Sequence, residues 1–302
     1  MHILVKQGEQ VVNDDGPPSE HSPYVLPFVS ALKAAGHTVS VVIPDTARSW
    51  IGKAHIVGRT LKVTSYLPNT VADDEEWMLV DGTPASCTQL GLFHLLQHRG
   101  PVDLVVSGPN HGRNTTSIYN LSSGTVGGAL EAALCRKNAI ALSFASKDPQ
   151  PLEVIQSACK LSVELVNHLC QNWADGVELY CINVPMVPEV NLRKILYTTP
   201  LRNFWTKSSL FQELTEAERR NECQSYTGQQ PVTPSYNGYS LDQQARQFRW
   251  APELSDVHRS VAESPSGTDA WAVKEGYTRY KPSPSMSEYS QVLISLIKAS
   301  LR

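Results

Sequence analysis

Thr38-Val39-Ser40-Val41-Val42-Ile43 is a short and nearly continuous run of apolar residues, most of them β-branched. Runs of this kind are typical of strands in a parallel sheet, since helices cover both faces of such a sheet. Further strand-like runs lie at 77–80, 104–106, 139–143 and 179–184, and helical patterns lie at 24–35, 84–97, 125–134 and 153–172. This alternation predicts parallel βαβ units. We therefore expect an α/β fold with a doubly wound, mostly parallel, Rossmann-like sheet.

The last third of the chain departs from this alternation. Residues 188–252 are rich in Gln, Asn and Tyr and contain Pro231 and Pro234, which indicates an irregular excursion from the sheet. Helical periodicity returns near the end and predicts a C-terminal helix within 283–302. Because 302 residues are compatible with one large α/β domain, we expect residues 1–302 to form a single domain.

The composition argues against several classes of partner. The chain is 41% hydrophobic and 18% charged, with a formal net charge of −3. Proteins that bind nucleic-acid polymers or anionic membranes are usually strongly basic, so we expect neither partner. No run is long and apolar enough to cross a bilayer, and the N-terminus lacks the apolar core of a signal peptide. Six scattered cysteines without a Cys-x-x-Cys pair complete the expectation of a cytoplasmic protein with reduced thiols.

Two adjacent carboxylates, Asp14 and Asp15, end a short apolar run and precede the turn-forming residues Gly16-Pro17-Pro18. Two acidic side chains at the end of a buried strand suit a divalent cation such as Mg²⁺ or Mn²⁺. Ligands of open α/β sheets bind at this edge, outside the carboxyl ends of the strands. The alternative interpretation is that both residues merely cap a turn.

Three further polar segments favour the metal site, because each begins where a predicted strand ends or enters a helix. They are residues 44–49, 107–114 and 122–129. In a parallel sheet they converge on the acidic pair. Asp14 and Asp15 then provide negative oxygens, while Ser49 and Asn110 provide neutral ones. Together they form an incomplete octahedral shell with positions left for water and substrate.

Residues Ser123-Gly124-Thr125 lie at the start of a predicted helix and suit an anion. Free backbone N–H groups and the positive end of the helix dipole would face a phosphate there. Gly124 allows close approach of the backbone, and the two hydroxyl groups add donors. A metal site facing a phosphate site is the arrangement of a metal-assisted phosphate ester hydrolase.

Four segments, in this order, resemble the signature segments of the SurE survival-protein family. They are Asn13-Asp14-Asp15-Gly16, Ser107-Gly108-Pro109-Asn110-His111-Gly112-Arg113-Asn114, Ser123-Gly124-Thr125-Val126-Gly127-Gly128-Ala129 and the late run from Gly267 to Tyr277. The stretch 13–24 is more similar to the fungal cytosolic branch, some members of which are fused to a tubulin-tyrosine-ligase-like domain. No such second domain fits in these 302 residues.

The resemblance implies a divalent-metal-dependent phosphatase, a 5′- or 3′-nucleotidase with acid phosphatase activity, acting on small nucleoside monophosphates. Carried over by position, the metal ligands fall on Asp14, Asp15, Ser49 and Asn110, and the phosphate-binding residues on Asn114, Ser123, Gly124 and Thr125. The catalytic residues would be Asp14, Asp15 and Asn110, with one carboxylate, by preference Asp14, orienting or deprotonating the nucleophile. Similar proteins also imply a homodimer or homotetramer with hairpins and helices exchanged between subunits.

One departure from the family pattern supports a different function. The family runs directly from its first strand into Asn-Asp-Asp-Gly, so Met1–Val5 should continue as Val12; here the polar segment 6–11 intervenes. Burying its side chains without partners would cost about 1–3 kcal/mol per group, so the segment must loop out or reassign the strand. An insertion there would favour a catalytically inactive scaffold of the same fold. A third possible function is that of a nucleotide-binding transferase. The Gly-rich motifs that such enzymes usually carry are missing from this sequence.

Other residues in these segments allow two interpretations. His111 could act as a general base or could hydrogen-bond the loop backbone. Arg48 and Lys53 could help to hold phosphate or could be solvated loop charges. Trp205, Trp250 and Trp271 could stack on a nucleobase, although core or subunit contacts explain them equally simply.

Overall fold

The computed structural model describes residues 8–68, 76–146, 148–206, 209–219 and 246–284. The chain divides into two compact units, residues 1–202 with 264–302 and residues 203–263. Among the described residues, no helix combines the length and the apolar character needed to cross a membrane.

In the described part of the larger unit, nine strands form one sheet in the order β3-β4-β2-β1-β5-β6-β7-β11-β8. The strands are β1 (Gly8–Val12), β2 (Thr38–Pro44), β3 (Val63–Tyr66), β4 (Trp77–Val80), β5 (Leu104–His111), β6 (Asn138–Phe144), β7 (Val177–Val184), β8 (Ile195–Tyr197) and β11 (Thr278–Pro284). The six from β4 to β7 in the sheet are parallel. Strand β3 is antiparallel to β4, and β11 is antiparallel to β7. The predicted strands at 38–43, 77–80, 104–106, 139–143 and 179–184 are confirmed.

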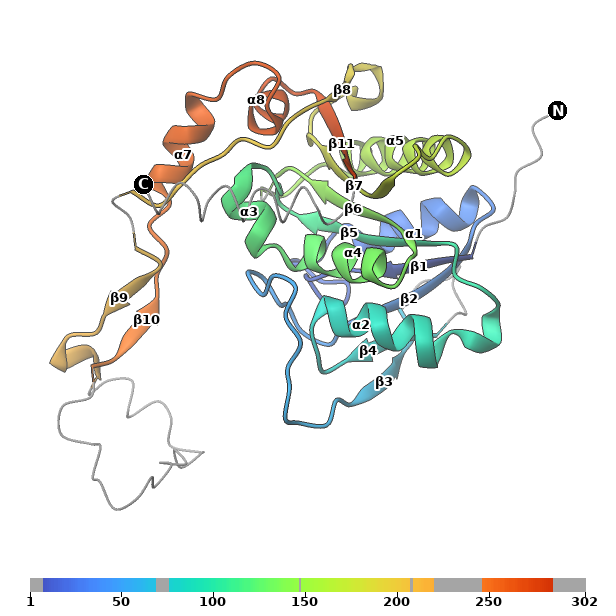
Figure 1. Ribbon diagram of the computed structural model, residues 1–302, viewed down its shortest axis with the longest axis horizontal. Coiled ribbons are helices and arrows are strands. Elements are labelled where there is room, and N and C mark those ends of the chain that lie inside the picture. The colour runs from blue at the N-terminus through green and yellow to red at the C-terminus, as the bar shows by residue number, and fades with distance from the viewer. Residues whose placement is uncertain (1–7, 69–75, 147, 207–208, 220–245, 285–302) are drawn as a thin grey trace. The chain divides into compact units, whose positions relative to one another are not determined.

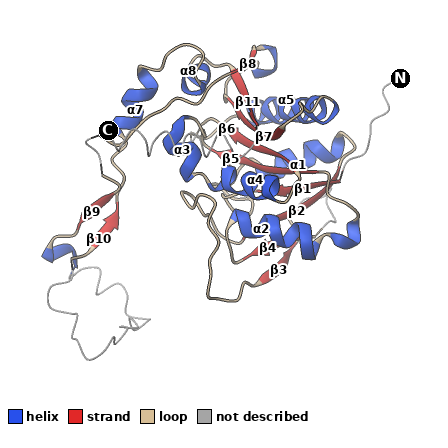
Figure 2. Ribbon diagram, in the orientation of Figure 1, coloured by secondary structure: helices blue, strands red, loops and turns tan. Residues whose placement is uncertain are grey.

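Helices cover both faces of this sheet (Figure 1 and Figure 2). The α-helices described in the larger unit are α1 (Val25–Ala34), α2 (Pro84–Leu90), α3 (Thr116–Ser122), α4 (Gly124–Leu134), α5 (Leu152–Gln171) and α8 (Asp269–Lys274). Helices α1 and α5 contribute to one buried apolar cluster, and α2 and α4 to a second. The doubly wound α/β fold is therefore confirmed.

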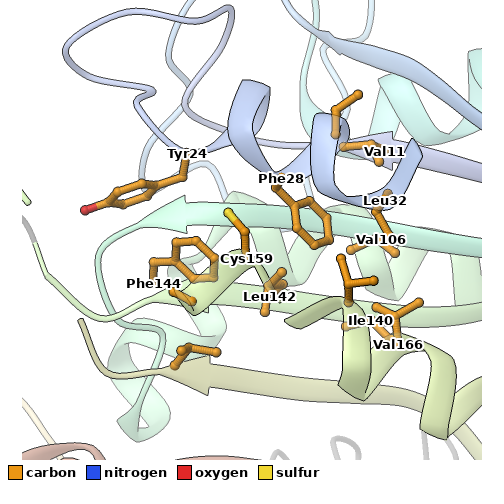
Figure 3. Packing of buried hydrophobic residues seen from close by; sticks show 14 of the residues in the cluster. Val11, Tyr24, Phe28, Leu32, Val106, Ile140, Leu142, Phe144, Cys159 and Val166 are labelled. Atoms are coloured by element: carbon orange, nitrogen blue, oxygen red, sulfur yellow. The ribbon is translucent and has the colours of Figure 1, made fainter. Parts of the chain in front are cut away.

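The two buried apolar clusters, one on each face of the sheet, explain why the strands are continuous apolar runs in the sequence. Neighbouring residues of one strand enter opposite clusters, as Val105 and Val106 do on β5. Figure 3 shows part of the first cluster, in which Phe28 and Leu32 of α1 gather with Val106 of β5 and Ile140 of β6. A strand buried on both faces has no solvent side, so the alternation of polar and apolar residues disappears.

The polar segment 6–11 was expected either to loop out or to reassign the first strand, and its described residues, 8–11, show the second outcome. Residues 1–7 lie outside the described part, and Gly8–Val12 is itself the central strand β1, paired with β2 and β5. Its polar side chains have partners from distant segments. Gln10 Nε2 donates to the carbonyl oxygen of Cys87 at 3.0 Å, and Glu9 Oε1 lies 2.8 Å from His37 Nδ1. These contacts lower the cost of burial, and β1 leads directly into Asn13.

The smaller unit contains an antiparallel ribbon of β9 (Phe211–Glu213) and β10 (Phe248–Trp250), followed by α7 (Ser255–Ala262). Every residue of the ribbon is exposed. Part of the predicted excursion, 220–245, lies outside the described residues. The C-terminal helix predicted for 283–302 does not begin at 283, since 283–284 end strand β11; residues 285–302 lie outside the described part.

Candidate active site

The predicted site lies where the winding of the sheet changes direction. Strands β1 and β5 are neighbours, and from them the chain builds outward through β2 and β4 on one side and through β6 and β7 on the other. Ligands of open α/β sheets bind in the crevice at such a switch point. Asp14 and Asp15 follow β1, and Asn110 lies near the end of β5, so three predicted ligands come from the two strands that flank the crevice.

Asp14 is a buried carboxylate, 3% exposed, that contacts the start of α4. The Thr125 hydroxyl donates to its Oδ1 at 2.5 Å. Burial raises the pKa of Asp14, against hydrogen bonds from the Thr125 hydroxyl and from the backbone N–H groups of Asp14, Thr125 and Gly124. In the described part of the chain, no Lys or Arg forms an ion pair with this carboxylate. The charged form therefore has hydrogen-bond donors but, among the described residues, no Lys or Arg to balance it.

Gly124 is required by this contact. A Cβ at position 124 would lie 2.7 Å from Asp14 Cβ and 3.0 Å from Asp14 Oδ2. Ser123 caps the same helix, because its Oγ accepts the Val126 N–H at 3.1 Å. The start of α4 thus holds Asp14 itself, with the hydroxyl hydrogen of Thr125 directed at the carboxylate.

Asp15 lies against the end of β5. Its Oδ2 accepts the His111 N–H at 2.7 Å, which brings the second carboxylate next to Asn110. Burial, followed by the Asp15 and Asp148 carboxylates, raises the pKa of Tyr24 to about 12. The His111 ring packs edge-on against Tyr24, with its Nδ1 3.2 Å from the carbonyl oxygen of His21, as the interpretation of His111 as a loop-bound residue expects.

Asn110 is presented by an irregularity in β5. Between Ser107 and Asn110 the register with β6 shifts, so that three steps on β5 oppose two on β6. Such a bulge redirects the side chains that follow it. The Asn110 Nδ2 donates to the carbonyl oxygen of Gly112 at 2.6 Å, which leaves Oδ1 as the acceptor of this amide.

Ser49 and Trp50 form the corner of a turn in which the Ile51 N–H donates to the Arg48 carbonyl oxygen at 3.4 Å. The Arg48 N–H in turn donates to the main-chain oxygen of Asp14 at 2.7 Å, so this turn starts directly beside the acidic pair. Ser49 is exposed at its corner.

Both the side chain and the backbone of Asn114 form hydrogen bonds within the protein. Its Nδ2 donates to Ser143 Oγ at 2.9 Å, and its backbone N–H donates to Asn183 Oδ1 at 2.8 Å. Its carbonyl oxygen accepts from Asn183 Nδ2 and from the buried Arg279. These bonds fix the loop after β5, and one of them uses the side-chain amide of Asn114, which was predicted to bind phosphate.

Asp269 is a positioning residue without a predicted role. It is fully buried; its Oδ2 accepts the Thr116 N–H and its Oδ1 the Leu201 N–H, both at 2.8 Å. Thr116 has a φ of 72°, a left-handed conformation that is unfavourable for a β-branched residue. Asp269 thus holds the strained first residue of α3, two residues after Asn114. The late run from 267 was quoted as a family segment, which was the available signal.

The two cations considered for phosphate are neutralised within the protein. The Arg48 guanidinium lies 3.3 Å from Asp45 and 3.2 Å from Asp81. Lys53 Nζ forms an ion pair with Glu131 of α4. Both side chains therefore hold the 45–53 segment to its neighbours.

In the described residues, no group of three or more His, Cys, Asp or Glu side chains could hold a metal ion. The assembled donors are of another type: two carboxylates, an amide oxygen and a nearby hydroxyl. An uncompensated buried carboxylate among neutral oxygen donors fits a hard divalent cation.

Comparisons with known proteins identify the family. The family described as "Survival protein SurE" matches residues 10–207. The 5′-nucleotidase SurE of Nitratidesulfovibrio vulgaris is 36% identical over 198 residues, which cover 65% of this chain and 73% of that protein. The probable tubulin–tyrosine ligase PBY1 of Saccharomyces cerevisiae is 37% identical over 235 residues, covering 65% of this chain but only 31% of that longer protein.

A solved structure agrees over nearly the whole chain. The SurE protein from Aquifex aeolicus superposes with a TM-score of 0.62 at 26% identity, covering 92% of this chain and 93% of that one. The family match begins inside β1 and includes all the segments that converge on the acidic pair. The chain belongs to the SurE survival-protein family.

Proposed function

We propose that this protein is a divalent-metal-dependent phosphomonoesterase that hydrolyses nucleoside 5′- or 3′-monophosphates, a nucleotidase with general acid phosphatase activity. The single observation that supports it best is the buried Asp14 carboxylate, which faces the positive end of α4 without an ion-pair partner in the described part of the chain. The bacterial relatives named 5′-nucleotidase SurE support the same reaction.

In this proposal Asp14, Asp15, Ser49 and Asn110 hold Mg²⁺ or Mn²⁺. The cation supplies electrophilic assistance to phosphoryl transfer and generates a nucleophile from water. Asp14, fixed by Thr125 and by the N–H of Gly124, orients the attacking water. Ser123, Gly124 and Thr125, with Asn114, border the phosphate, whose charge lies in the field of α4.

The test is phosphate release from p-nitrophenyl phosphate and from adenosine 5′-monophosphate. Turnover should require Mg²⁺ or Mn²⁺, disappear with EDTA and return when metal is restored. Absence of metal-dependent release from every ester would favour the inactive scaffold instead. The main support for that alternative was an insertion at 6–11, and residues 8–12 form strand β1.

We also propose self-association through the β9–β10 ribbon, as a homodimer or homotetramer, in the cytoplasm. Phe211 and Trp250 pack edge-on at 5.4 Å on an exposed ribbon, and each is about half exposed. Large aromatic side chains in such numbers on so small an element are typical of an interface.

A further inference from the structure

We infer that Trp50 and Tyr119 form a stacking platform for an aromatic leaving group, so that Trp50 sets the preference for nucleoside esters over aliphatic ones. This inference rests on the proposed phosphomonoesterase function and assigns a residue to its selectivity.

The first argument is the position of Trp50. It has a φ of 62°, in the left-handed region, at the third residue of the turn 48–51. A turn with this conformation normally has glycine there. The chain instead has its largest side chain at that corner, next to the proposed metal ligand Ser49. A glycine would fit this backbone with less strain.

The second argument is what Trp50 contacts. Its ring meets Tyr119 of α3 edge to face, with centroids 5.8 Å apart and planes at 76°. Both side chains are partly exposed. An edge-to-face pair that is only partly buried is suited to accept a third aromatic ring.

The third argument is that this pair is held beside Asp14. The Gly52 N–H donates to the Ser122 carbonyl oxygen at 2.9 Å, which fastens the turn to the junction of α3 and α4. A Cβ at Gly124 would meet both Asp14 and the Ile51 side chain, so residue 51 already contacts the space next to the carboxylate. Trp50 is thus the chain neighbour of a residue whose side chain contacts this space.

The fourth argument is charge. Arg113, from the loop that follows Asn110 and the end of β5, lies against the Tyr119 hydroxyl, which opposes the rise in the Tyr119 pKa that burial causes. Within the described ranges, Arg113 forms no ion pair, unlike Arg48 and Lys53. A cation beside an aromatic pair matches a ligand that joins a phosphate to an aromatic ring.

The kinetic test uses Trp50→Gly, because glycine relieves the left-handed backbone and keeps the protein folded. We expect the ratio of kcat/KM for adenosine 5′-monophosphate to that for glycerol 2-phosphate to fall about 10-fold, as expected for loss of one base-stacking contact. Trp50→Phe should restore most of the ratio. Trp173→Phe is the control, because Trp173 precedes β7 at the opposite edge of the sheet, and it should keep the wild-type ratio.

A binding test separates this inference from the proposed function. In an Asp14→Asn background, equilibrium dialysis compares adenosine 5′-monophosphate with ribose 5-phosphate, with and without Trp50→Gly. We expect the adenosine ester to lose about 10-fold in affinity relative to the sugar phosphate. Equal losses for both ligands, or no change in their ratio, would overturn the platform. Absence of turnover in the wild-type chain would contradict the phosphomonoesterase alone, since the binding ratio still decides the platform.

Discussion

At the scale of single residues, the Asp14 carboxylate is buried and its hydrogen-bond donors are neutral groups. A substitution there should therefore lower activity without lowering the free energy of unfolding. Asp14→Asn removes a charge whose burial is unfavourable while keeping the shape of the side chain. We expect kcat/KM to fall by at least about 100-fold, as for loss of a group that stabilises transition-state charge, while the free energy of unfolding stays equal or rises. Steady-state kinetics and urea denaturation measure the two effects.

Asp45→Asn is the matched control. Asp45 follows β2 at the same edge, but its partly exposed carboxylate pairs with Arg48. It should retain nearly wild-type turnover. Equal losses of activity in both variants would contradict the assignment of Asp14 as a ligand.

Gly124 gives a second residue-scale prediction. In Gly124→Ala the new methyl group would lie 2.7 Å from Asp14 Cβ and 3.0 Å from Asp14 Oδ2, so the Asp14 side chain would have to move. We expect weaker metal binding, seen as a roughly 10-fold higher metal concentration for half-maximal activity. Gly82→Ala is the control, because its Cβ would meet only side-chain atoms at 3.2–3.4 Å. A metal requirement that stays unchanged in Gly124→Ala would argue against a ligand role for Asp14.

At the scale of elements, Asp269 connects α8 to the strained first residue of α3. Asp269→Asn replaces one acceptor oxygen by an amide group, so one of the Thr116 and Leu201 N–H groups loses its partner. We expect a loss of about 3 kcal/mol in the free energy of unfolding, with turnover reduced because Asn114 and its loop shift. Glu275→Gln, an exposed change just after the same helix, should leave the urea midpoint within error. A wild-type midpoint for Asp269→Asn would refute the positioning role.

The Glu9–His37 contact links β1 to the loop before β2 and predicts a pH dependence. The Glu9 carboxylate raises the pKa of His37 in the folded chain, against the effect of burial. A raised folded pKa contributes stability that is complete below the unfolded value, about pH 6.5, and is lost as pH rises through the folded value. The difference in unfolding free energy between wild type and His37→Gln should therefore shrink from pH 5.5 to pH 9. Exposed His98→Gln should follow wild type throughout, and a difference that grows with pH would contradict the pair.

Most of the parallel strands could be predicted, because each is a continuous apolar run rich in β-branched residues and is bounded by turn-forming residues. Strand β1 could not, since Glu9 and Gln10 look exposed until His37 and the Cys87 carbonyl, distant in the sequence, are brought to them. Helix α3 was missed because it is short and begins at a residue with positive φ. For the site, adjacent acidic residues at a strand end were a local signal. The roles of Asp269 and Trp50 depend on contacts made only after folding.

At the scale of the whole molecule, the exposed aromatic side chains of the β9–β10 ribbon predict an oligomer. A substitution in the ribbon should weaken that oligomer without changing the candidate active site. Trp250→Ser should raise the dissociation constant of the oligomer about 10-fold or more, because Trp residues dominate the energetics of many interfaces. Light scattering across a dilution series measures the change. Phe93→Ser is the control, since Phe93 is also about half exposed but lies on the larger unit. A mass that is the same for wild type and Trp250→Ser at every dilution would refute the ribbon as the interface.

The close approach of Gly52 to Gly127 limits how this chain can diversify. A Cβ at 127 would lie 2.2 Å from the Gly52 carbonyl oxygen, so even alanine there would displace the neighbouring turn. Because one corner carries both Ser49 and Trp50, such a displacement would disturb cation retention and ester discrimination together. Homologues that evolve new ester preferences should therefore conserve Gly52 and Gly127. They should vary the side chain at position 50 instead.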